Sequence, residues 1–202
     1  MIPIVADQSG ACAPLRYPAH LVAFRHLPDG THVVLRPIRP QDDAIELAFI
    51  GSLSSATRYN RLISGRRLTP EEIRRLTRID YEREMAFVAV TADAGQARLL
   101  GVARYVMDSA GAGAEFAIVV ADAWQHKGTG SLLLGMLLQY AQSAGLARLH
   151  GVTLATNQAA QGLARKFGFA QRPFPRDATL RLIEKALAAG VSNDGRYLPT
   201  LQ

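Results

Sequence analysis

A strand-like segment, a loop with two glycines and a helical segment follow one another near the middle of this 202-residue chain. The segment "AEFAIVVA" (114–121) is apolar and rich in β-branched residues, as strands are. After the loop "DAWQHKGTG", apolar residues recur on one face of a predicted helix over 131–144. Glycines let an anion approach the main chain, and the N–H groups of residues 126–131 would point outward at the positive end of that helix. The arrangement therefore predicts a turn that binds phosphate.

Two common phosphate loops do not fit these residues. A Walker loop needs Gly-x-x-x-x-Gly-Lys-Ser/Thr, whereas here Lys127 precedes Gly128 and no earlier glycine stands at the required spacing. The dinucleotide loop Gly-x-Gly-x-x-Gly fails because Leu133 stands where its third glycine belongs. What remains is the pattern Gln125-x-x-Gly128-x-Gly130, to which Lys127 adds a positive charge.

The rest of the sequence predicts a mixed α+β chain. Antiparallel strand pairs come first, and a β-α-β crossover follows. The order of elements is β-α-α-β-β-β-α-β-α-β, which is not that of a doubly wound sheet. Besides an extended segment at 169–174, we expect strands at 31–38, 85–92, 97–108, 114–121, 147–155 and 179–187, and helices after Asp42-Asp43, after the capping box Thr69-Pro70-Glu71-Glu72, and over 131–144 and 157–167.

The predicted domain organisation is one domain over residues 30–188, since a chain of this length supports one ordinary domain better than two. Residues 1–29 carry loop chemistry such as Ser9-Gly10 and Pro28-Asp29-Gly30 and are expected to form an extension. Residues 189–202 are expected to form a flexible tail.

Composition and residue spacing exclude several classes. No apolar run approaches the length of a bilayer span and the N-terminus does not read as a signal peptide, so we expect no membrane partner and a cytoplasmic protein. The single cysteine, Cys12, and five dispersed histidines lack the spacing of a disulfide framework or a metal site, and no metal is expected. The net charge is +6, but no DNA- or RNA-binding motif accompanies it, so no nucleic-acid partner is expected.

Arginine makes up 20 of the 23 basic side chains, and eight of these arginines fall between residues 58 and 83, against four acids. That segment is a candidate surface for an acidic partner. The simpler explanation is a solvated helix face whose charges pair with one another.

The loop and the helix that follows resemble those of the GNAT superfamily of acyl-CoA N-acyltransferases. The pyrophosphate loop of that family reads Arg/Gln-x-x-Gly-x-Gly/Ala, which residues 125–130 match, and "TNQAAQGLARKFGF" (156–169) looks like its Asn-containing helix that ends in Gly-Phe. The resemblance spans about residues 31–186. "LRPIRPQD", "IDYEREMAFVAV" and "AEFAIVVADAWQ" are similar to the acetyltransferase domain of bacterial Pat-type protein-lysine acetyltransferases. The resemblance to the GNAT superfamily implies a mostly antiparallel sheet, splayed into a V between its middle strands and flanked by helices.

The resemblance also implies that the bound phosphate is the pyrophosphate of acetyl-CoA. The pantetheine arm would run along the strand that ends at Val120, where the splay frees main-chain groups, and one N–H would act as an oxyanion donor. Asn157 either bonds the cofactor arm or caps the helix that it starts, and His126 supplies only its backbone N–H. The residues expected to bind the cofactor are Ile118, Val119, Val120, Gln125, His126, Lys127, Gly128, Thr129, Gly130, Ser131 and Asn157.

Glu115 is the predicted general base. An amine that attacks a thioester must lose a proton, because the pKa of lysine, about 10.4, keeps it charged at neutral pH. Glu115 is the only acid of its segment before Asp122, its apolar neighbours would raise its pKa by desolvation, and the resemblance points to the same position. The alternative is a carboxylate at a strand end that faces water.

The general acid of the reaction has no obvious residue in this sequence. Many GNAT enzymes carry a tyrosine where this chain has Ala164. The thiolate of the leaving group, with an ordinary thiol pKa of about 8.5, would then depart unprotonated or take a proton from water. Tyr105 and Tyr140 are other donors that the sequence does not place.

Together these features predict an acetyl-CoA-dependent N-acetyltransferase that acts on protein lysines by direct attack. Two alternatives stay open. One is a transferase for small amines or amino acids, and the other is a non-catalytic module that binds acyl-CoA and regulates a partner. The sequence leaves the acyl-chain preference open and does not distinguish a monomer from a dimer.

Overall fold

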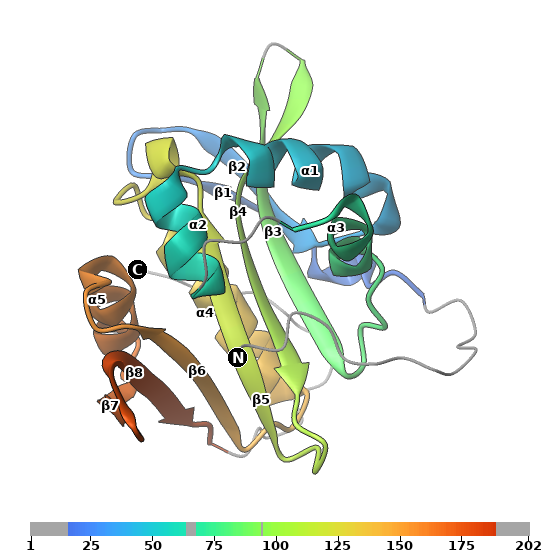
Figure 1. Cartoon of the computed structure of the whole chain (residues 1–202). Helices are drawn as coiled ribbons and strands as arrows, with labels where there is room; N and C mark the ends of the chain where they lie inside the picture. Colours follow the sequence, from blue (N-terminus) through green and yellow to red (C-terminus); the bar gives the residue numbers. More distant parts are fainter. Residues whose placement is uncertain (1–15, 64–67, 94, 189–202) are drawn as a thin grey trace.

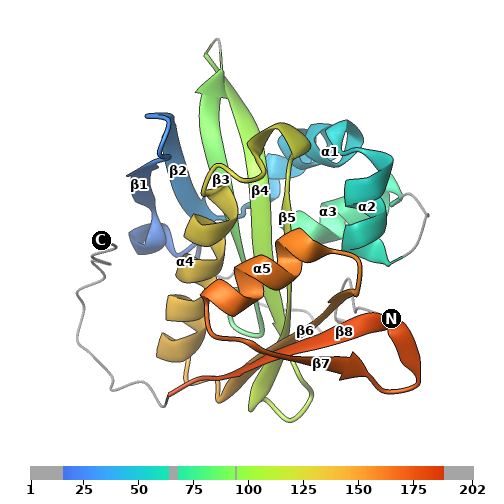
Figure 2. The same ribbon diagram turned by 90° about the vertical axis from the view of Figure 1, so that its left-hand side faces the viewer.

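A computed structural model of the chain describes residues 16–63, 68–93 and 95–188. Its regular elements, in chain order and apart from three short 3₁₀ turns, are β1 (Ala23–His26), β2 (His32–Pro37), α1 (Asp43–Ser52), α2 (Ser55–Leu62), α3 (Pro70–Thr77), β3 (Glu84–Asp93), β4 (Gln96–Met107), β5 (Gly113–Val120), α4 (Thr129–Ser143), β6 (Arg148–Leu154), α5 (Gln158–Lys166), β7 (Ala170–Phe174) and β8 (Asp177–Ala186). The strands form one sheet in the order β1-β2-β3-β4-β5-β6-β8-β7. Helices α1, α2 and α3 lie on one side of the central strands and α4 on the other (Figures 1 and 2). The predicted mixed α+β fold is confirmed.

The sheet is splayed between its two middle strands. All neighbouring strands pair antiparallel except β5 and β6, which run parallel over three residue pairs, from Gly113 and Arg148 to Glu115 and His150. Beyond Glu115 the two strands part, and residues 116–120 of β5 keep only β4 as a neighbour. The V between β5 and β6 in Figure 1 is the expected splay.

Part of the segment expected to be an extension belongs to the sheet. Strand β1 pairs with β2 from Ala23 and Leu35 to His26 and His32, so the sheet begins before residue 30. The turn between them uses Gly30 at φ +84°, beside the Asp29 carboxylate, which accepts the N–H of Thr31. The strand escaped prediction because it has only four residues and no apolar run; its one large apolar side chain, Phe24, is 74% exposed. Residues 1–15 and the expected tail 189–202 lie outside the described residues.

A helix that the sequence did not predict, α2, follows α1. Its N-cap Ser54 accepts the N–H of Thr57, and the carboxylate of Asp122 accepts the N–H and hydroxyl of Ser54 and the hydroxyl of Thr57. The helix is mostly polar, which hid it from a search for apolar periodicity. The predicted capping box of α3 is confirmed: Thr69 and Glu72 exchange side-chain and backbone bonds of 2.7 and 3.2 Å.

Side chains of β3 alternate between two apolar cores, one on each side of the sheet. Phe87 packs in the core that Leu137 of α4 closes, and Val88 packs in the core that Phe49 of α1 closes. Full burial of side chains of this kind contributes about 1.5–3 kcal/mol each. The two cores fix α4 and the α1–α3 layer on opposite sides of β4 and β5, which positions the site. Within the described part of the chain, no helix is long and apolar enough to span a membrane.

Candidate active site

The backbone of β5 presents main-chain groups to the V at two positions. Ala121 donates its N–H to Leu100 at 2.8 Å, and the alternation of an antiparallel pair then directs the backbone of residues 115, 117 and 119 toward β4. The backbone groups of Ile118 and Val120 point the other way, where β6 has already diverged. Three residues were predicted to bind the pantetheine arm. The backbone N–H and C=O of Val119 point toward β4, whereas those of Ile118 and Val120 point into the V.

The loop after β5 forms a concave surface of N–H groups. His126 adopts φ +60° and Gly128 φ +91°, and no side chain caps the start of α4. The first N–H groups of a helix have no partner inside the helix, so those of residues 129–131 face outward. Alternating left-handed and right-handed backbone of this kind makes an anion-binding nest. The helix begins at Thr129, two residues before the predicted start, which brings the loop glycines directly to its end.

A cavity of about 610 Å³, which we call the outer cavity, lies between this loop, β5, α2 and α5. Two predicted residues do not line it: the Lys127 ammonium lies 4.9 Å from the centre of the Trp124 ring, and the Thr129 side chain is fully buried. At Thr129 only the backbone N–H at the helix start is left to serve an anion. The predicted cofactor residues that line the cavity are Ile118, Val119, Val120, Gln125, His126, Gly128, Gly130, Ser131 and Asn157.

Two polar side chains of the outer cavity hold its walls together. The amide nitrogen of Gln125 donates to the carbonyl of Val120 at 3.1 Å and to the hydroxyl of Thr57 at 3.2 Å, which ties the loop to β5 and α2. Asn157 caps α5 by accepting the N–H of Ala160 at 3.1 Å. Of the two roles left open for Asn157, the cap is observed; it uses Oδ1 only, and the residue also lines the cavity.

Sequence reasoning missed a lysine and several α2 residues in the outer cavity. Lys166, at the end of α5, lines it and donates to the hydroxyl of Ser131 at 3.0 Å, so its charge stands beside the start of α4. From α2 come Thr57, Asn60 and Arg61. In the sequence, Lys166 stood out only as a basic residue in the last turn of a predicted helix. The α2 residues were missed because the helix itself was not predicted.

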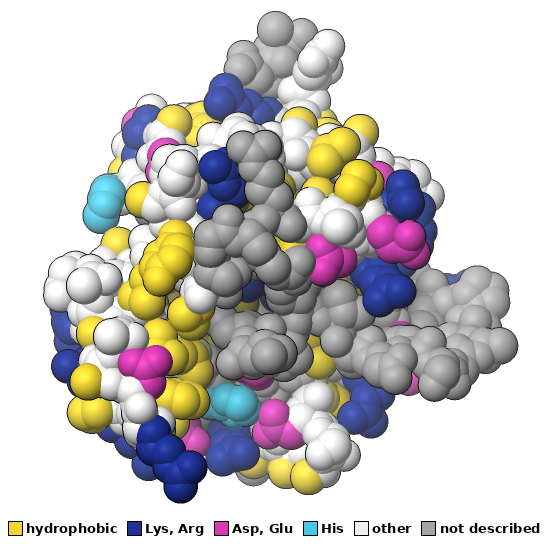
Figure 3. All heavy atoms as spheres, viewed as in Figure 1, with side chains coloured by type: hydrophobic (Ala, Val, Ile, Leu, Met, Phe, Trp, Pro, Cys, Tyr) yellow, Lys and Arg dark blue, Asp and Glu magenta, His cyan; other side chains and the backbone are white. Residues whose placement is uncertain are grey.

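Glu115 stands at the vertex of the V, at the last residue pair that joins β5 to β6. Its side chain is half-buried; burial raises the pKa of this carboxyl, and the charge of the neighbouring His150 opposes the rise. His150 in turn lies 3.1 Å from the carboxylate of Asp108, which also pairs with Arg148. Figure 3 shows acidic, basic and histidine side chains together at this lower end of the face. Glu115 does not line the outer cavity, but its side chain lies on the same face of β5 as those of Ala117 and Val119.

The tyrosines considered as proton donors lie elsewhere. Tyr105 is fully buried in the core, and the Tyr140 hydroxyl donates to the carbonyl of Tyr81 at 3.2 Å. Ala164 is buried and packs in the core beside α4. Among the described residues that line the outer cavity there is no tyrosine.

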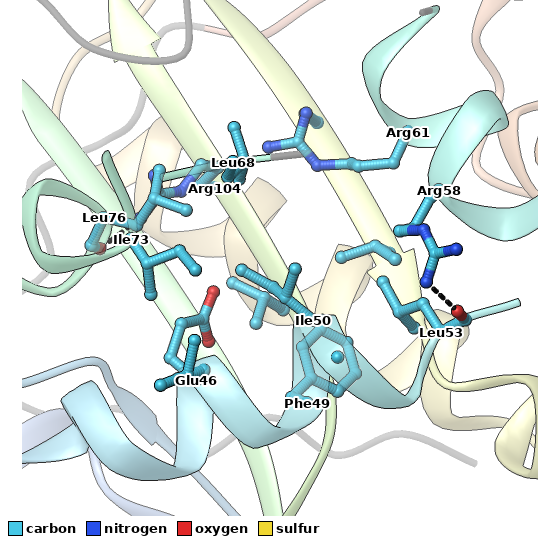
Figure 4. Close-up of a pocket in the computed structure, with 15 residues that line it drawn as sticks. Glu46, Phe49, Ile50, Leu53, Arg58, Arg61, Leu68, Ile73, Leu76 and Arg104 are labelled. Carbon is cyan, nitrogen blue, oxygen red and sulfur yellow. Dashed lines mark hydrogen bonds between the residues drawn. The ribbon is translucent and has the colours of Figure 1, made fainter. Parts of the chain in front are cut away.

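A second cavity, the inner cavity, of about 250 Å³ lies on the opposite face of β5 under α1, α2 and α3. Apolar side chains of the three helices and of β4 and β5 make up most of its wall. Four charged side chains also line it: Arg58, whose guanidinium is bonded to the wall, and Glu46, Arg61 and Arg104, which enter the cavity (Figure 4). Arg61 and Val119 line both cavities, so the two meet at β5.

The arginine-rich segment does not form one free surface. Arg58 donates to the carbonyl of Leu53 at 2.6 Å, Arg61 enters the inner cavity, and Arg78 pairs with Asp43 at 2.8 Å. Arg74 and Arg75 are exposed on α3. Arg83 donates to the carbonyl of Asp108 at 3.4 Å, and the arginines at positions 66 and 67 lie outside the described residues. Four of the eight arginines are therefore engaged within the domain, which weakens the expectation of a surface for an acidic partner.

Comparison with known proteins gives consistent matches to this fold. The acetyltransferase (GNAT) domain profile matches residues 32–170. Acetyltransferase PA5475 of Pseudomonas aeruginosa is 34% identical over 154 residues, which cover 76% of this chain and 83% of that protein. Acetyltransferase Pat of Mycolicibacterium smegmatis is 31% identical over 140 residues, 69% of this chain but only 41% of that protein. The crystal structure of the GNAT domain of S. lividans PAT superposes with a TM-score of 0.76 at 25% identity, over 85% of this chain and all of that domain.

Proposed function

Because this chain belongs to the GNAT family of acetyltransferases, we propose that it transfers the acetyl group of acetyl-CoA to a lysine amine of a protein, with Glu115 as general base. The observation that carries the proposal is the arrangement along β5. One strand bears the half-buried carboxyl at the vertex of the V, two outward-facing backbone positions in its middle, and the uncapped helix start beyond its end.

The outer cavity fits the proposed donor. Its closed end is the concave loop before α4, where outward N–H groups, the helix dipole and the Lys166 ammonium favour a pyrophosphate. A side chain at Gly130 would bring a Cβ to 3.3 Å from Leu163, so α5 packs tightly against the loop. Acetyl-CoA supplies the activated thioester when bound, and the residues of this chain hold and orient it.

The open edge of β5 supplies donors where negative charge would develop. Backbone N–H groups of Ile118 and Val120 point into the V, and the carbonyl of Val120 is already engaged by Gln125. A fixed N–H directed at a carbonyl oxygen stabilises the charge that forms there as the amine attacks. We therefore assign Ile118 and Val120, rather than Val119, the main-chain contacts with the donor.

Glu115 meets the requirements of the base. Its raised pKa makes it a better proton acceptor than a free carboxylate, while its half-buried position leaves it open to an incoming amine. Glu115 lies three positions before Ile118, which is roughly 10 Å along a strand. The Glu115 side chain, the attacking amine and bridging water, joined by hydrogen bonds of about 3 Å each, cover that distance. The amine nitrogen forms the new bond to the acyl carbon, its proton goes to Glu115, and the C–S bond breaks to release the thiolate, which water protonates.

The choice of a protein lysine rests on the resemblance of "LRPIRPQD" and "IDYEREMAFVAV" to Pat-type enzymes. Relatives named Pat and PAT are similar to this chain over most of its length. The chain spans 41% of the Mycolicibacterium relative, so acceptor and regulation of that whole protein are not carried over.

The decisive experiment is a labelled acetyl-CoA assay against a cell lysate with wild type, Glu115→Gln and the exposed control Glu82→Gln. We expect labelled lysines in lysate proteins, a rate about 10²–10⁴ lower for Glu115→Gln, and an unchanged rate for Glu82→Gln. Because the base must be ionised, the wild-type rate should rise with pH through the raised pKa of Glu115. Glu115→Gln should lose that rise while its affinity for acetyl-CoA stays the same.

Three results would contradict the proposal, each in a different part. An unchanged rate in Glu115→Gln removes the base. Label that appears only on small amines replaces the protein acceptor with a small one. Binding of acetyl-CoA without transfer to proteins, peptides or amines makes the chain a non-catalytic acyl-CoA-binding module.

A further inference from the structure

The inner cavity contains buried charges that the proposed transfer does not use. Arg104 of β4 is 6% exposed and Glu46 of α1 is 3% exposed, and both enter a cavity whose wall is otherwise mainly apolar. Burial of an ionised side chain is unfavourable unless a partner compensates it. The cavity therefore calls for a charged occupant or a complete ion-pair network.

The network among these side chains is incomplete. Nη1 of Arg61, Nη1 of Arg104 and Oε2 of Glu46 are buried atoms without a hydrogen-bond partner among the described residues. Arg104 does donate through Nη2 to the carbonyl of Leu76, which fixes its guanidinium at the cavity wall. In Figure 4, Arg61 reaches into the cavity from α2 and Arg104 from β4, and the carboxyl of Glu46 points toward them from α1. Two donors thus converge on a space that no described side chain fills.

Arg58, in the wall of the same cavity, does have a hydrogen-bond acceptor. Its guanidinium donates to the carbonyl of Leu53 at 2.6 Å, at the end of α1 (Figure 4). Arg61, one turn later on the same helix, has no such acceptor for Nη1. The two arginines differ in their surroundings: a backbone carbonyl lies beside the guanidinium of Arg58, whereas Nη1 of Arg61 has no acceptor among the described residues.

The charge balance of the cavity is positive. Two guanidinium groups face one carboxyl, and burial raises the pKa of Glu46 to about 7, with Arg104 and Arg61 opposing the rise. At neutral pH the Glu46 carboxyl is therefore partly protonated and compensates less than one of the two positive charges. An anionic group in the cavity would supply the missing compensation, and planar guanidinium forks match a carboxylate.

The position of the cavity restricts the source of that anion. Arg61 and Val119 belong to both cavities, so the inner cavity opens at the stretch of β5 where the thioester of a bound donor would lie. Its volume of about 250 Å³ is far larger than the methyl end of an acetyl group requires. A group held there is attached to, or about to react with, the acyl carbon.

We propose that the inner cavity binds a small carboxylate through Arg61 and Arg104, next to the thioester. The carboxylate belongs either to the far end of a dicarboxylic acyl group carried by CoA or to a small acceptor amine. This inference rests on the proposed function only in placing acyl-CoA in the outer cavity. A dicarboxylic donor extends the acyl groups beyond acetyl, and a small carboxylated amine extends the acceptors beyond protein lysines.

The test is binding without turnover, by calorimetry with acetyl-CoA, malonyl-CoA and succinyl-CoA. If the donor carries the carboxylate, wild type binds one of the two dicarboxylic donors about tenfold to a hundredfold more tightly than acetyl-CoA. Arg61→Gln removes the preference and Arg61→Lys keeps part of it. Arg75→Gln, an exposed arginine of α3 outside the cavity, leaves it unchanged. Melting temperatures check that each variant is folded; Arg61 is partly exposed on α2, so its replacement should be tolerated.

A second arm identifies an acceptor carboxylate. Wild type with CoA bound is titrated with free amino acids and with the same amino acids as carboxyl amides. Tighter binding of the free acids, lost in Arg61→Gln, assigns the carboxylate to the acceptor. If neither arm shows a preference while acetyl-CoA still binds, the inference is wrong and the proposed function stands. If no acyl-CoA binds at all, the outer-cavity assignment fails as well.

Discussion

The two faces of β5 bear cavities lined by different kinds of chemical group. On the side of α4 and α5, the outer cavity is formed mainly by backbone groups, glycines and the start of a helix, with Lys166 and, from α2, Arg61 as supplementary charges. On the face of α1, α2 and α3, the inner cavity is formed by apolar side chains around Glu46, Arg61 and Arg104. One strand therefore separates a site made mainly of main chain from a site made of side chains.

The difference determines how each face carries its polar groups. The N–H groups at a helix start are present in any helix and remain solvated until a ligand arrives, so the outer cavity needs no buried charge. The inner cavity keeps ionisable groups away from water, which is unfavourable for folding. We therefore expect changes on the inner face to alter stability and its pH dependence, and changes on the outer face to alter cofactor affinity.

The largest effect should come from Glu46 on the inner face. Its pKa is raised from an ordinary value of 4.5 to about 7 in the folded chain. The folded state thus holds the proton of Glu46 more tightly than the unfolded state does. The contribution of this proton to the stability of the fold is complete below pH 4.5 and is lost as the pH rises through 7. We expect this carboxyl to lower the free energy of unfolding by up to about 3 kcal/mol across that window.

Urea denaturation of wild type and Glu46→Gln from pH 4 to pH 8 measures this effect. The difference in unfolding free energy between the two should fall across the window, because glutamine cannot titrate. The exposed control Glu71→Gln should run parallel to wild type at every pH. A constant difference between wild type and Glu46→Gln would mean that Glu46 has no raised pKa, and the two faces would not differ in this respect.

A smaller effect is expected from Gly128 on the outer face. Its φ of +91° is unfavourable for other residues, and an added Cβ would lie 3.3 Å from Cδ of Pro28. We expect Gly128→Ala to weaken acetyl-CoA binding about tenfold and to lower the unfolding free energy by about 1–2 kcal/mol. Isothermal calorimetry and urea denaturation measure the two quantities on the same protein.

Gly111 provides the matched control for this change. It adopts φ +73° in a turn away from the loop, with open space around an added Cβ. Gly111→Ala should lose similar stability through backbone strain and keep the affinity for acetyl-CoA. Equal loss of affinity in both variants would contradict a specific role of the 126–131 loop in cofactor binding.

The outer face was predictable because its parts are contiguous in sequence. Residues 114–131 contain the strand, the glycines and the helix start, and a strand followed by such a loop leaves few geometries open. The splay beyond Glu115 and the β-α-β crossover followed the predicted order of elements. Which of residues 118–120 faces the V depends on the register with β4, which the sequence does not reveal.

The inner face was not predictable for equally physical reasons. Glu46, Arg61 and Arg104 lie on three separate elements, and each reads in the sequence as an ordinary solvated charge. Arg61 also belongs to α2, whose polar sequence gave no helical periodicity. Only the packing of α1–α3 on β4 and β5 brings these charges together and buries Glu46 and Arg104.

The smallest effect is expected from Lys166, a side-chain charge of the outer cavity that sequence reasoning missed. Its ammonium donates to Ser131 beside the start of α4 from an exposed position, so salt and water screen it. We expect Lys166→Gln to weaken acetyl-CoA binding about twofold to fivefold at low salt, and less at high salt. Arg165→Gln, on the adjacent residue and outside the cavity, should leave the affinity unchanged. A loss for Lys166→Gln as large as that for Gly128→Ala would contradict the view that backbone groups, rather than side chains, supply most of the binding on this face.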